Sequence, residues 1–215
     1  MSWTGTGYER RGYHHGNLRE ALIEAALALI AELGPSGFTV AEAARRAGVS
    51  PAAPYRHFRD AEALLAEIAV RGFERFTIAL ARSWQDGKPD PLRAFENLCR
   101  AYLAFARDEP AFYAAMFETR IDFANYPPLQ VASDHAFAIL RDASERLATT
   151  LVPAKRPPAL MIALHVWAMA HGIASLFGRG DAGRKLPMSP EELLEAGILL
   201  YLQSLGLAGG HGPEK

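Results

Sequence analysis

Hydrophobic and polar side chains follow each other along most of the chain with the three- and four-residue steps of amphipathic helices. The first series places on one face Leu18, Leu22, Ala25, Leu29 and Leu33. The same spacing returns in the segments 65–80, 92–105, 160–171 and 194–205. No stretch sustains the two-residue alternation of β-branched residues that is typical of a strand. The pattern therefore predicts an all-α protein of about nine or ten helices.

Clusters of glycine and proline interrupt these periodic segments. They predict breaks at 34–37, 85–91, 126–128, 152–158 and 178–190. One helix is expected from about Asp60 to Trp84, joining a group of short N-terminal helices to a C-terminal group. We therefore expect two domains, over residues 13–60 and 61–207.

The segment from Phe38 to Phe58 carries the signals of a helix-turn-helix. Thr39 can cap a helix, and Glu42 follows three residues later, which is the pattern of a capping box. Gly48 ends this helix early, because glycine tolerates the left-handed backbone of a tight helix exit. Ser50-Pro51 then restarts a helix, with serine as N-cap and proline at the first position. Two short helices joined by a turn that contains glycine predict a helix-turn-helix.

The second helix of this motif is expected to expose polar side chains. Its first turn offers Pro51, Ala52 and Ala53, and the next turn offers Tyr55, Arg56 and His57, whereas Phe58 and Pro54 are expected to face inward. A short protruding helix with such tips fits the DNA major groove, where arginine contacts guanine. An ordinary helical hairpin with an exposed polar face is the alternative, but the coincidence of caps, turn and polar tips favours DNA binding.

Pro54 conflicts with a regular helix that starts at Ser50. Proline lacks the N–H for the first intrahelical hydrogen bond, and its ring crowds the carbonyl group four residues earlier. We therefore expect a distorted first turn or a late start of this helix.

Composition and charge exclude several classes of protein. Lys plus Arg number 23 and Asp plus Glu number 24, so any basic function must come from geometry rather than from net charge. The single cysteine, Cys99, excludes an intramolecular disulfide framework. The N-terminal residues hold no apolar signal segment, and no run of about 18 apolar residues is present. We therefore expect a cytoplasmic protein without a membrane partner.

Catalytic motifs are absent from the sequence. We find no H-E-x-x-H pattern, no Walker loop, no G-x-S-x-G pattern and no convincing pair of carboxylates. We therefore expect no enzyme activity, no cofactor and no metal site.

With these motifs, the segment 14–80 resembles the TetR family of bacterial transcriptional regulators. The resemblance rests on a first helix, a glycine break, the helix started by Thr39, Gly48-Val49-Ser50, the run Tyr55-Arg56-His57-Phe58 and a long connecting helix. It implies a homodimer in which an N-terminal three-helix DNA-binding domain is joined by a long fourth helix to a C-terminal helical bundle. It further implies that this bundle dimerises and binds a small molecule, whose binding releases an operator in double-stranded DNA.

Carried over residue by residue, the resemblance assigns phosphate contacts to Thr39, Ser50, Tyr55 and His57. It assigns base-facing positions to Pro51, Ala52, Ala53 and Arg56. Family members commonly have a lysine at the start of the long helix, where this chain has Ala61. Arg59 is a candidate substitute, and Arg45 or Arg46 could add contacts. A second, shorter likeness is the run from Trp167 through His171 to Gly172, which resembles the W-x-x-x-H-G motif of one subgroup.

The C-terminal half is rich in aromatic residues and methionine, which predicts a cavity for a mainly apolar molecule between helices. The candidate ligand-binding residues are Phe95, Cys99, Tyr102, Tyr113, Met116, Phe117, Trp167 and His171. Core packing is the alternative for most of these rings. For His171 the alternative is a hydrogen bond within the core or the dimer seam, and for Cys99 it is a buried, inert thiol.

Two late helices carry more apolar surface than one neighbour can cover. Ala168, Gly172 and Ser175 form a stripe of small residues that allows close approach of another helix, and 190–206 is a candidate partner. Uncovered apolar surface on two helices is typical of a four-helix dimer interface, to which each protomer contributes two helices.

The leading hypothesis is a ligand-responsive repressor that binds as a dimer to a pseudo-palindromic operator, with half-sites about 10 bp apart or a multiple of that distance. The alternatives are a helical small-molecule-binding protein and a corepressor-dependent regulator or activator.

Overall fold

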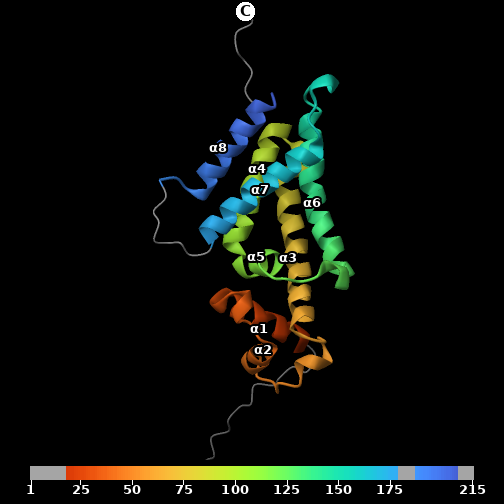
Figure 1. The fold of residues 1–215 in the computed structure, drawn as a ribbon, viewed down its shortest axis with the longest axis vertical. Helices are drawn as coiled ribbons and strands as arrows, with labels where there is room; N and C mark the ends of the chain where they lie inside the picture. Colours follow the sequence, from red (N-terminus) through yellow and green to blue (C-terminus); the bar gives the residue numbers. More distant parts are fainter. Residues whose placement is uncertain (1–17, 179–186, 208–215) are drawn as a thin grey trace, which may run out of the picture.

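The computed structural model describes residues 18–178 and 187–207, and every regular element in these ranges is helical. The predicted all-α class is therefore confirmed. The α-helices are α1 Leu18–Leu33, α2 Val40–Arg46, α3 Ala61–Trp84, α4 Pro91–Asp108, α5 Pro110–Phe117, α6 Pro127–Ala148, α7 Ala159–Gly178 and α8 Pro190–Ser204. Figure 1 shows α1 and α2 at one end of an elongated molecule, α8 near the other end, and α3 reaching from the first group into the second.

The short helix α2 begins and ends where the sequence predicts. The Thr39 hydroxyl accepts a hydrogen bond from the Glu42 backbone N–H at 3.2 Å, and Gly48 has a φ of 72°. The second half of the predicted capping box is not formed. The Glu42 carboxylate instead accepts hydrogen bonds from Arg45 on the next turn. Thr39 therefore caps α2 alone.

The segment after Gly48 folds into tight turns instead of a regular α-helix. The Ser50 carbonyl accepts from Ala53, and a 3₁₀ turn covers Pro54–Arg56 without a side-chain cap. Ser50 is therefore not the N-cap of a regular helix. Pro54 is the reason, because it has no N–H to donate, and its own carbonyl accepts from both His57 and Phe58 at 2.9 Å. The expected distortion is confirmed, and so is the burial of Pro54 and Phe58.

Helix α3 begins directly after this turn. The Asp60 carboxylate caps it by accepting from the Ala63 backbone N–H at 2.8 Å. The apolar face of α3 that the three- and four-residue spacing predicts is largely buried. Its residues Ile68, Phe76 and Leu80 are each at most 4% exposed. At Gly72 the helix passes very close to α5, because a Cβ placed there would lie 2.7 Å from the Met116 sulfur. Glycine is therefore what allows this approach.

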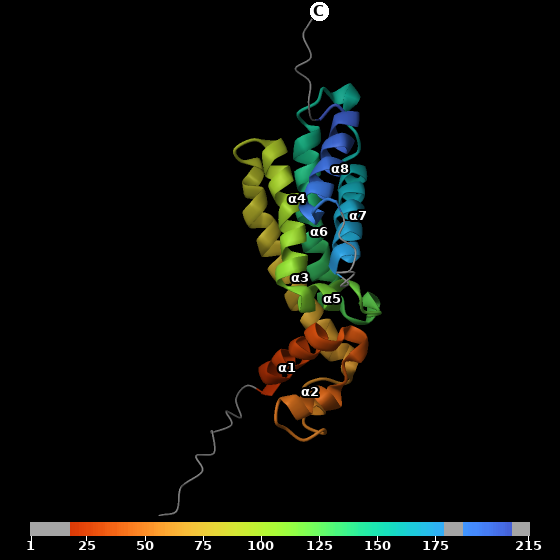
Figure 2. The same ribbon diagram turned by 90° about the vertical axis from the view of Figure 1, so that its left-hand side faces the viewer.

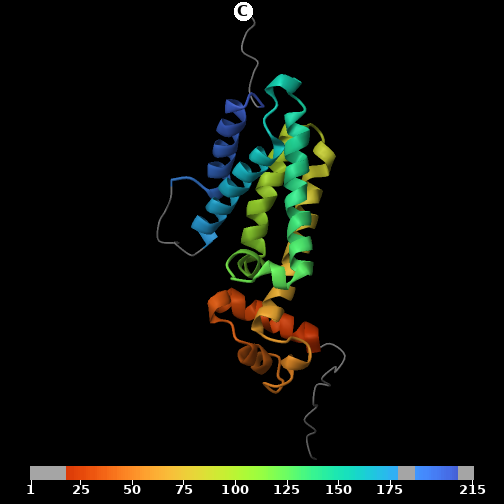
Figure 3. The ribbon, with the colours of Figure 1, turned by 45° about the vertical axis from the view of Figure 1, so that its right-hand side comes forward.

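The buried side chains form one continuous cluster. It runs from Leu22 in α1 through α3 and α5 into the bundle of α4, α6, α7 and α8, where Leu202 belongs to it. Short α5 contacts both α1 and α3, with Phe112, Tyr113 and Met116 buried. Figure 2 shows α5 between α1 and the upper bundle, and Figure 3 shows α6 beside α3 and α7. No separate core divides α1 and α2 from the rest of the described chain.

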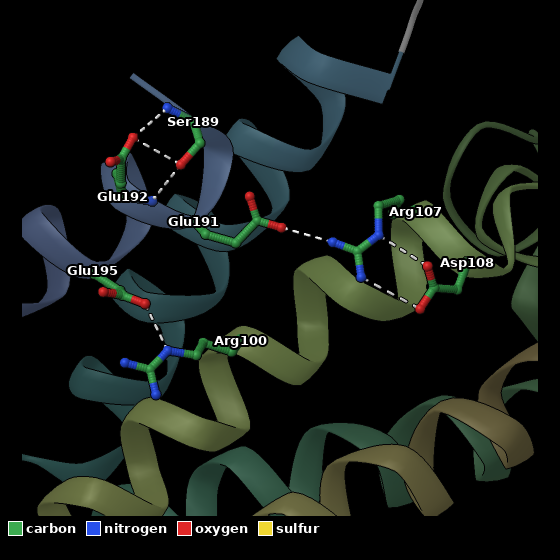
Figure 4. A network of polar contacts seen from close by, with 7 residues as sticks. All are labelled: Arg100, Arg107, Asp108, Ser189, Glu191, Glu192 and Glu195. Atoms are coloured by element: carbon green, nitrogen blue, oxygen red, sulfur yellow. Dashed lines mark hydrogen bonds and ion pairs between the residues drawn. The ribbon is translucent and has the colours of Figure 1, made fainter. Parts of the chain in front are cut away.

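Helix α8 is held against α4 by ion pairs. Arg100 donates to Glu195 at 2.6 Å, and Arg107, which also pairs with Asp108, donates to Glu191 at 2.8 Å (Figure 4). Ser189 and Glu192 form a complete capping box at the start of α8. The two ion pairs connect α8 to α4, whereas the capping box stabilises the start of α8 itself.

Helix α7 exposes an apolar face. Leu160 is 51% exposed and Leu176 66%, and α8 adds Leu200 at 68%. Among the described helices, α7 has the length and the mean hydropathy of 1.7 that a membrane span would need. The absence of Asp, Glu, Lys and Arg from its 20 positions accounts for this value.

Candidate functional site

The residues predicted to contact DNA gather at the free end of the molecule. Thr39 and Ser50 are exposed, as are Pro51 and Ala52, whereas Ala53 is half-buried. The next three side chains, Tyr55, Arg56 and His57, are all exposed, and Tyr55 is 59% accessible. In Figure 2 the connection between α2 and α3 that carries them lies at the end of the described chain opposite α8.

The arginines of this surface differ in their partners. Arg45 pairs with Glu42, and Arg59 donates to Asp60 at 2.7 Å and to the Tyr126 hydroxyl at 3.4 Å. Hydrogen bonds from these arginines hold the pKa values of Glu42 and Asp60 below their usual range. Arg46 instead pairs with Glu32 in α1.

Within the described part of the chain, no carboxylate pairs with Arg56. Arg56 thus offers an exposed guanidinium without a carboxylate partner, whereas Arg45 and Arg59 can bind another anion only by leaving Glu42 and Asp60.

A cavity of about 240 Å³ lies between α3, α4, α5, α6 and α7. We call it the aromatic cavity, because six of its lining side chains carry rings. Those rings are Phe73, Phe76, Tyr102, Phe117, Phe137 and Trp167. The other lining residues are Leu80, Leu98, Ser133, Asp134, Ala136, Leu140 and Leu164. The position is typical of a small-molecule site between the helices of a bundle.

A buried polar centre lies behind the wall of this cavity. The hydroxyls of Tyr102 and Tyr113 lie 3.1 and 2.9 Å from the same atom, Nδ1 of His171. Burial raises the pKa of both tyrosines and lowers the pKa of His171, so all three groups favour their neutral forms. The structure thus unites three of the predicted ligand-binding residues in one hydrogen-bonded unit.

The other predicted ligand-binding residues separate into two groups. Phe117 and Trp167 line the aromatic cavity, as does Tyr102. Phe95 and Met116 are buried and do not line it. Cys99 lies toward α8, and burial raises the pKa of its thiol, which accords with the inert alternative.

Sequence reasoning missed the contributions of α3 and α6 to this cavity. Phe73 and Phe76 follow the helical spacing of α3, and that spacing predicts a buried face without saying that a cavity adjoins it. Ser133, Asp134 and Phe137 come from a helix that carried no motif. The contact of Phe137 with Trp167, with ring centroids 5.7 Å apart, depends on tertiary packing alone.

A second hollow, which we call the junction cavity, lies where α1 meets the bundle. It has a volume of about 560 Å³ and is lined by Ile30 and Pro35 near the end of α1, by Phe177 in α7, and by Tyr113. Tyr113 therefore lines the junction cavity while its hydroxyl shares His171 with Tyr102 of the aromatic cavity. The polar centre therefore has one tyrosine in the lining of each cavity, Tyr102 in the aromatic cavity and Tyr113 in the junction cavity.

Ion pairs join α1 to α3. Arg71 donates to Glu20 at 2.5 and 2.6 Å and to Glu67 at 3.0 Å, and Arg19 donates to Glu67 at 2.9 Å. The hydrogen bonds with Glu20 raise the pKa of Arg71, and those from Arg71 lower the pKa of Glu20. These four side chains thus form one network of ion pairs between α1 and α3.

Comparison with protein families gives two matches. The sequence model described as "Bacterial regulatory proteins, tetR family" matches residues 22–68, and the model "Tetracyclin repressor-like, C-terminal domain" matches residues 95–201. Among curated proteins, the chain is similar to an uncharacterized HTH-type transcriptional regulator, YobS, of Bacillus subtilis (strain 168). The two are 30% identical over 100 residues, which are 46% of this chain and 51% of YobS. The match thus spans about half the length of that relative.

Solved structures share the fold over nearly their whole length. A protein of unknown function from Rhodococcus sp. RHA1 is 29% identical, with a TM-score of 0.75 over 90% of this chain and 98% of its own. The TetR family transcriptional regulator PfmR from Thermus thermophilus is 22% identical, with a TM-score of 0.66 over 90% and 99%. The second likeness shows the fold alone.

Proposed function

Because the chain belongs to the tetR family of bacterial regulatory proteins, we propose that it is a transcriptional repressor that a small molecule releases from its operator. One observation carries this proposal. A surface with the exposed tips of Tyr55, Arg56 and His57 is joined by the single helix α3 to a cavity lined by aromatic rings. Residues 13–60 would bind DNA, and residues 61–207 would bind the effector and dimerise; residues 13–17 lie outside the described ranges.

At the DNA surface, Arg56 is the residue that we assign to a base edge, because an arginine without a carboxylate partner can form two hydrogen bonds with guanine. Tyr55, His57, Thr39 and Ser50 would contact phosphates. Arg45 and Arg59 would join them by exchanging Glu42 and Asp60 for phosphate. The exchange is accessible because these ion pairs are exposed to solvent, where such a pair contributes little to stability.

The dimer interface would be formed by the exposed apolar faces of α7 and α8. A Cβ placed at Gly172 would meet nothing within 4 Å, so the stripe of small residues is not covered by α8. Helix α8 instead packs on another flank of α7, where Gly197 faces Met169. The same stripe on a second copy could approach closely, and this gives the apolar composition of α7 a function in a dimer.

The effector would act through α3. Phe73, Phe76 and Leu80 of this helix line the aromatic cavity, and the same helix begins next to the DNA surface at Ala61. A molecule that prefers one position of α3 shifts the population between two spacings of the DNA-binding ends. The run Trp167-Ala-Met-Ala-His171-Gly172 lies at the cavity and its polar centre, and we propose that the W-x-x-x-H-G motif of the subgroup marks this wall.

Selection of binding sites from random duplex DNA by the purified protein tests the proposal. We expect a pseudo-palindrome with half-sites about 10 bp apart or a multiple of that distance. Anisotropy titration should then show that Arg56→Ala combined with Tyr55→Phe weakens operator binding by about 1–3 kcal/mol. Arg141→Ala, an exposed arginine of α6, is the matched control and should leave binding unchanged.

The outcomes separate the alternatives. Unchanged affinity of the double variant would remove the assigned recognition surface. Operator binding that requires an added small molecule would identify a corepressor-dependent regulator. No selected sequence under any condition would leave a helical small-molecule-binding protein.

A further inference from the structure

The aromatic cavity has an uneven distribution of charge. Six rings line it, and the one charged side chain among its lining residues is Asp134 of α6. No lysine or arginine contributes to the lining in the ranges 18–178 and 187–207. The walls of the aromatic cavity therefore carry aromatic rings and one carboxylate, both of which are groups that can attract a cation.

Asp134 is available to a ligand. Its side chain is exposed at the edge of the cavity, and Oδ1 accepts one hydrogen bond from Gln130 at 2.8 Å. No described group donates to Oδ2. The arginine two helical turns further along the same helix, Arg141, is paired with its neighbour Asp142. The Asp134 carboxylate thus keeps one oxygen, Oδ2, without a described hydrogen-bond donor at the edge of the cavity.

The rings of the cavity are held in fixed orientations by edge-to-face contacts. Phe76 meets Tyr102 with ring planes at 86°, and Phe73 meets Phe117 at 79°. Such contacts turn the positive edge of one ring toward the negative face of its neighbour. Rings that are fixed by their neighbours can act as rigid walls for a cation, at little entropic cost on binding.

We propose that the effector is a lipophilic monocation, an amine or quaternary ammonium compound with an apolar body. This inference rests on the proposed function of the cavity as the effector site. The cation lies against the aromatic rings, and its charge faces Asp134. A carboxylate or phosphate ester is disfavoured, because it would place a second negative charge beside Asp134 with no cationic side chain in the lining to compensate it.

Calorimetric titration of the full-length protein with three matched probes tests this inference. The probes are benzyltrimethylammonium, its neutral carbon isostere neopentylbenzene, and the anion 4-phenylbutyrate. We expect the cation to bind at least tenfold more tightly than the neutral probe, a difference of about 1.4 kcal/mol. The anion should bind at least tenfold more weakly than the neutral probe.

Two substitutions test which residues cause the preference for the cation. Asp134→Asn keeps the shape and the hydrogen bond from Gln130, and it should weaken the cation about fivefold to tenfold while leaving the neutral probe unchanged. Phe137→Leu should likewise reduce the preference for the cation. Asp142→Asn is the matched control, because Asp142 lies on the same helix away from the cavity, and it should leave all three affinities unchanged.

Operator binding, measured on the same samples, keeps the two proposals distinguishable. Equal binding of cation and neutral probe, unaffected by Asp134→Asn, would overturn the cationic class while the cavity remains the effector site. Absence of binding by the cation and the anion at millimolar concentration, and by the neutral probe up to its solubility, with intact operator binding, would overturn the inference and point to an effector of another class or another site. Absence of operator binding by the unsubstituted protein before any probe is added would contradict the proposed function itself.

Discussion

Gly72 and Gly197 provide a matched pair of glycine positions with opposite expected behaviour. Both lie inside helices, α3 and α8, and both face a methionine sulfur. A Cβ at Gly72 would lie 2.7 Å from the Met116 sulfur and 2.9 Å from its Cγ, whereas a Cβ at Gly197 would lie 3.6 Å from the Met169 sulfur. The first distance requires a displacement of Met116, and the second is an ordinary contact. Replacement by alanine should therefore change stability in opposite directions.

The magnitudes follow from two terms. In either helix, alanine in place of glycine gains about 0.8–1.0 kcal/mol of helix propensity. At Gly197 this gain is unopposed, so the free energy of unfolding should rise by about 1 kcal/mol. At Gly72 the overpacking against Met116 opposes it by about 1–3 kcal/mol, so the free energy of unfolding should fall by about 0–2 kcal/mol. The two variants should thus differ by about 1–3 kcal/mol.

Urea unfolding at one fixed protomer concentration measures both variants, with an unchanged m-value as the sign that only stability has changed. A double-mutant cycle of Gly72→Ala with Met116→Ala then isolates the contact, since removal of the Met116 side chain should abolish the penalty at position 72. If Gly72→Ala stabilised the protein as much as Gly197→Ala, Met116 would move without resistance. The close packing of α3 on α5 would then contribute no strain, and the reasoning would be refuted.

Two further predictions concern pH. Arg71→Ala removes the hydrogen bonds that lower the pKa of Glu20, so at pH 7 the free energy of unfolding should fall by about 1 kcal/mol for these partly exposed groups. Urea unfolding at pH 3 should show a smaller loss, because below pH 4.5 the unfolded carboxyl binds a proton and the stabilisation by the ion pair declines; equal losses at both pH values would contradict this. Burial lowers the pKa of His171 below 6.5, so below that pH the unfolded chain binds a proton that the folded chain excludes. Stability should therefore fall from pH 7.5 to 5.5 more steeply in the unsubstituted protein than in His171→Gln, and parallel melting curves would refute the role of burial.

Sequence signals within a few residues of each other were sufficient to predict most of the helices. Thr39 and Gly48 define α2 through interactions within a few residues, and the spacing of Ile68, Phe76 and Leu80 identifies the buried face of α3. The effect of Pro54 is local as well, since its missing N–H explains the 3₁₀ turn that replaces a regular helix. These features need no knowledge of the rest of the fold.

The cavity could be predicted only in part, because helical spacing identifies a buried face but not what each buried residue faces. On α4 the spacing groups Phe95, Leu98, Cys99 and Tyr102, and of these only Leu98 and Tyr102 line the aromatic cavity. The approach of Asp134 to the rings is set by the packing of α6 against α3 and α7, which no local pattern records.

The continuity of the buried cluster from Leu22 to Leu202 bears on how this regulator unfolds and how its parts can be exchanged. A chain with one core loses its structure as a cooperative unit, so the DNA-binding end has no stability that is independent of the bundle. Cutting the chain near Asp60 would expose the face of α1 that packs on α5, together with the buried side of α3. Recombination that joined this DNA-binding end to the bundle of another regulator would therefore have to carry α3 and a compatible α5 with it.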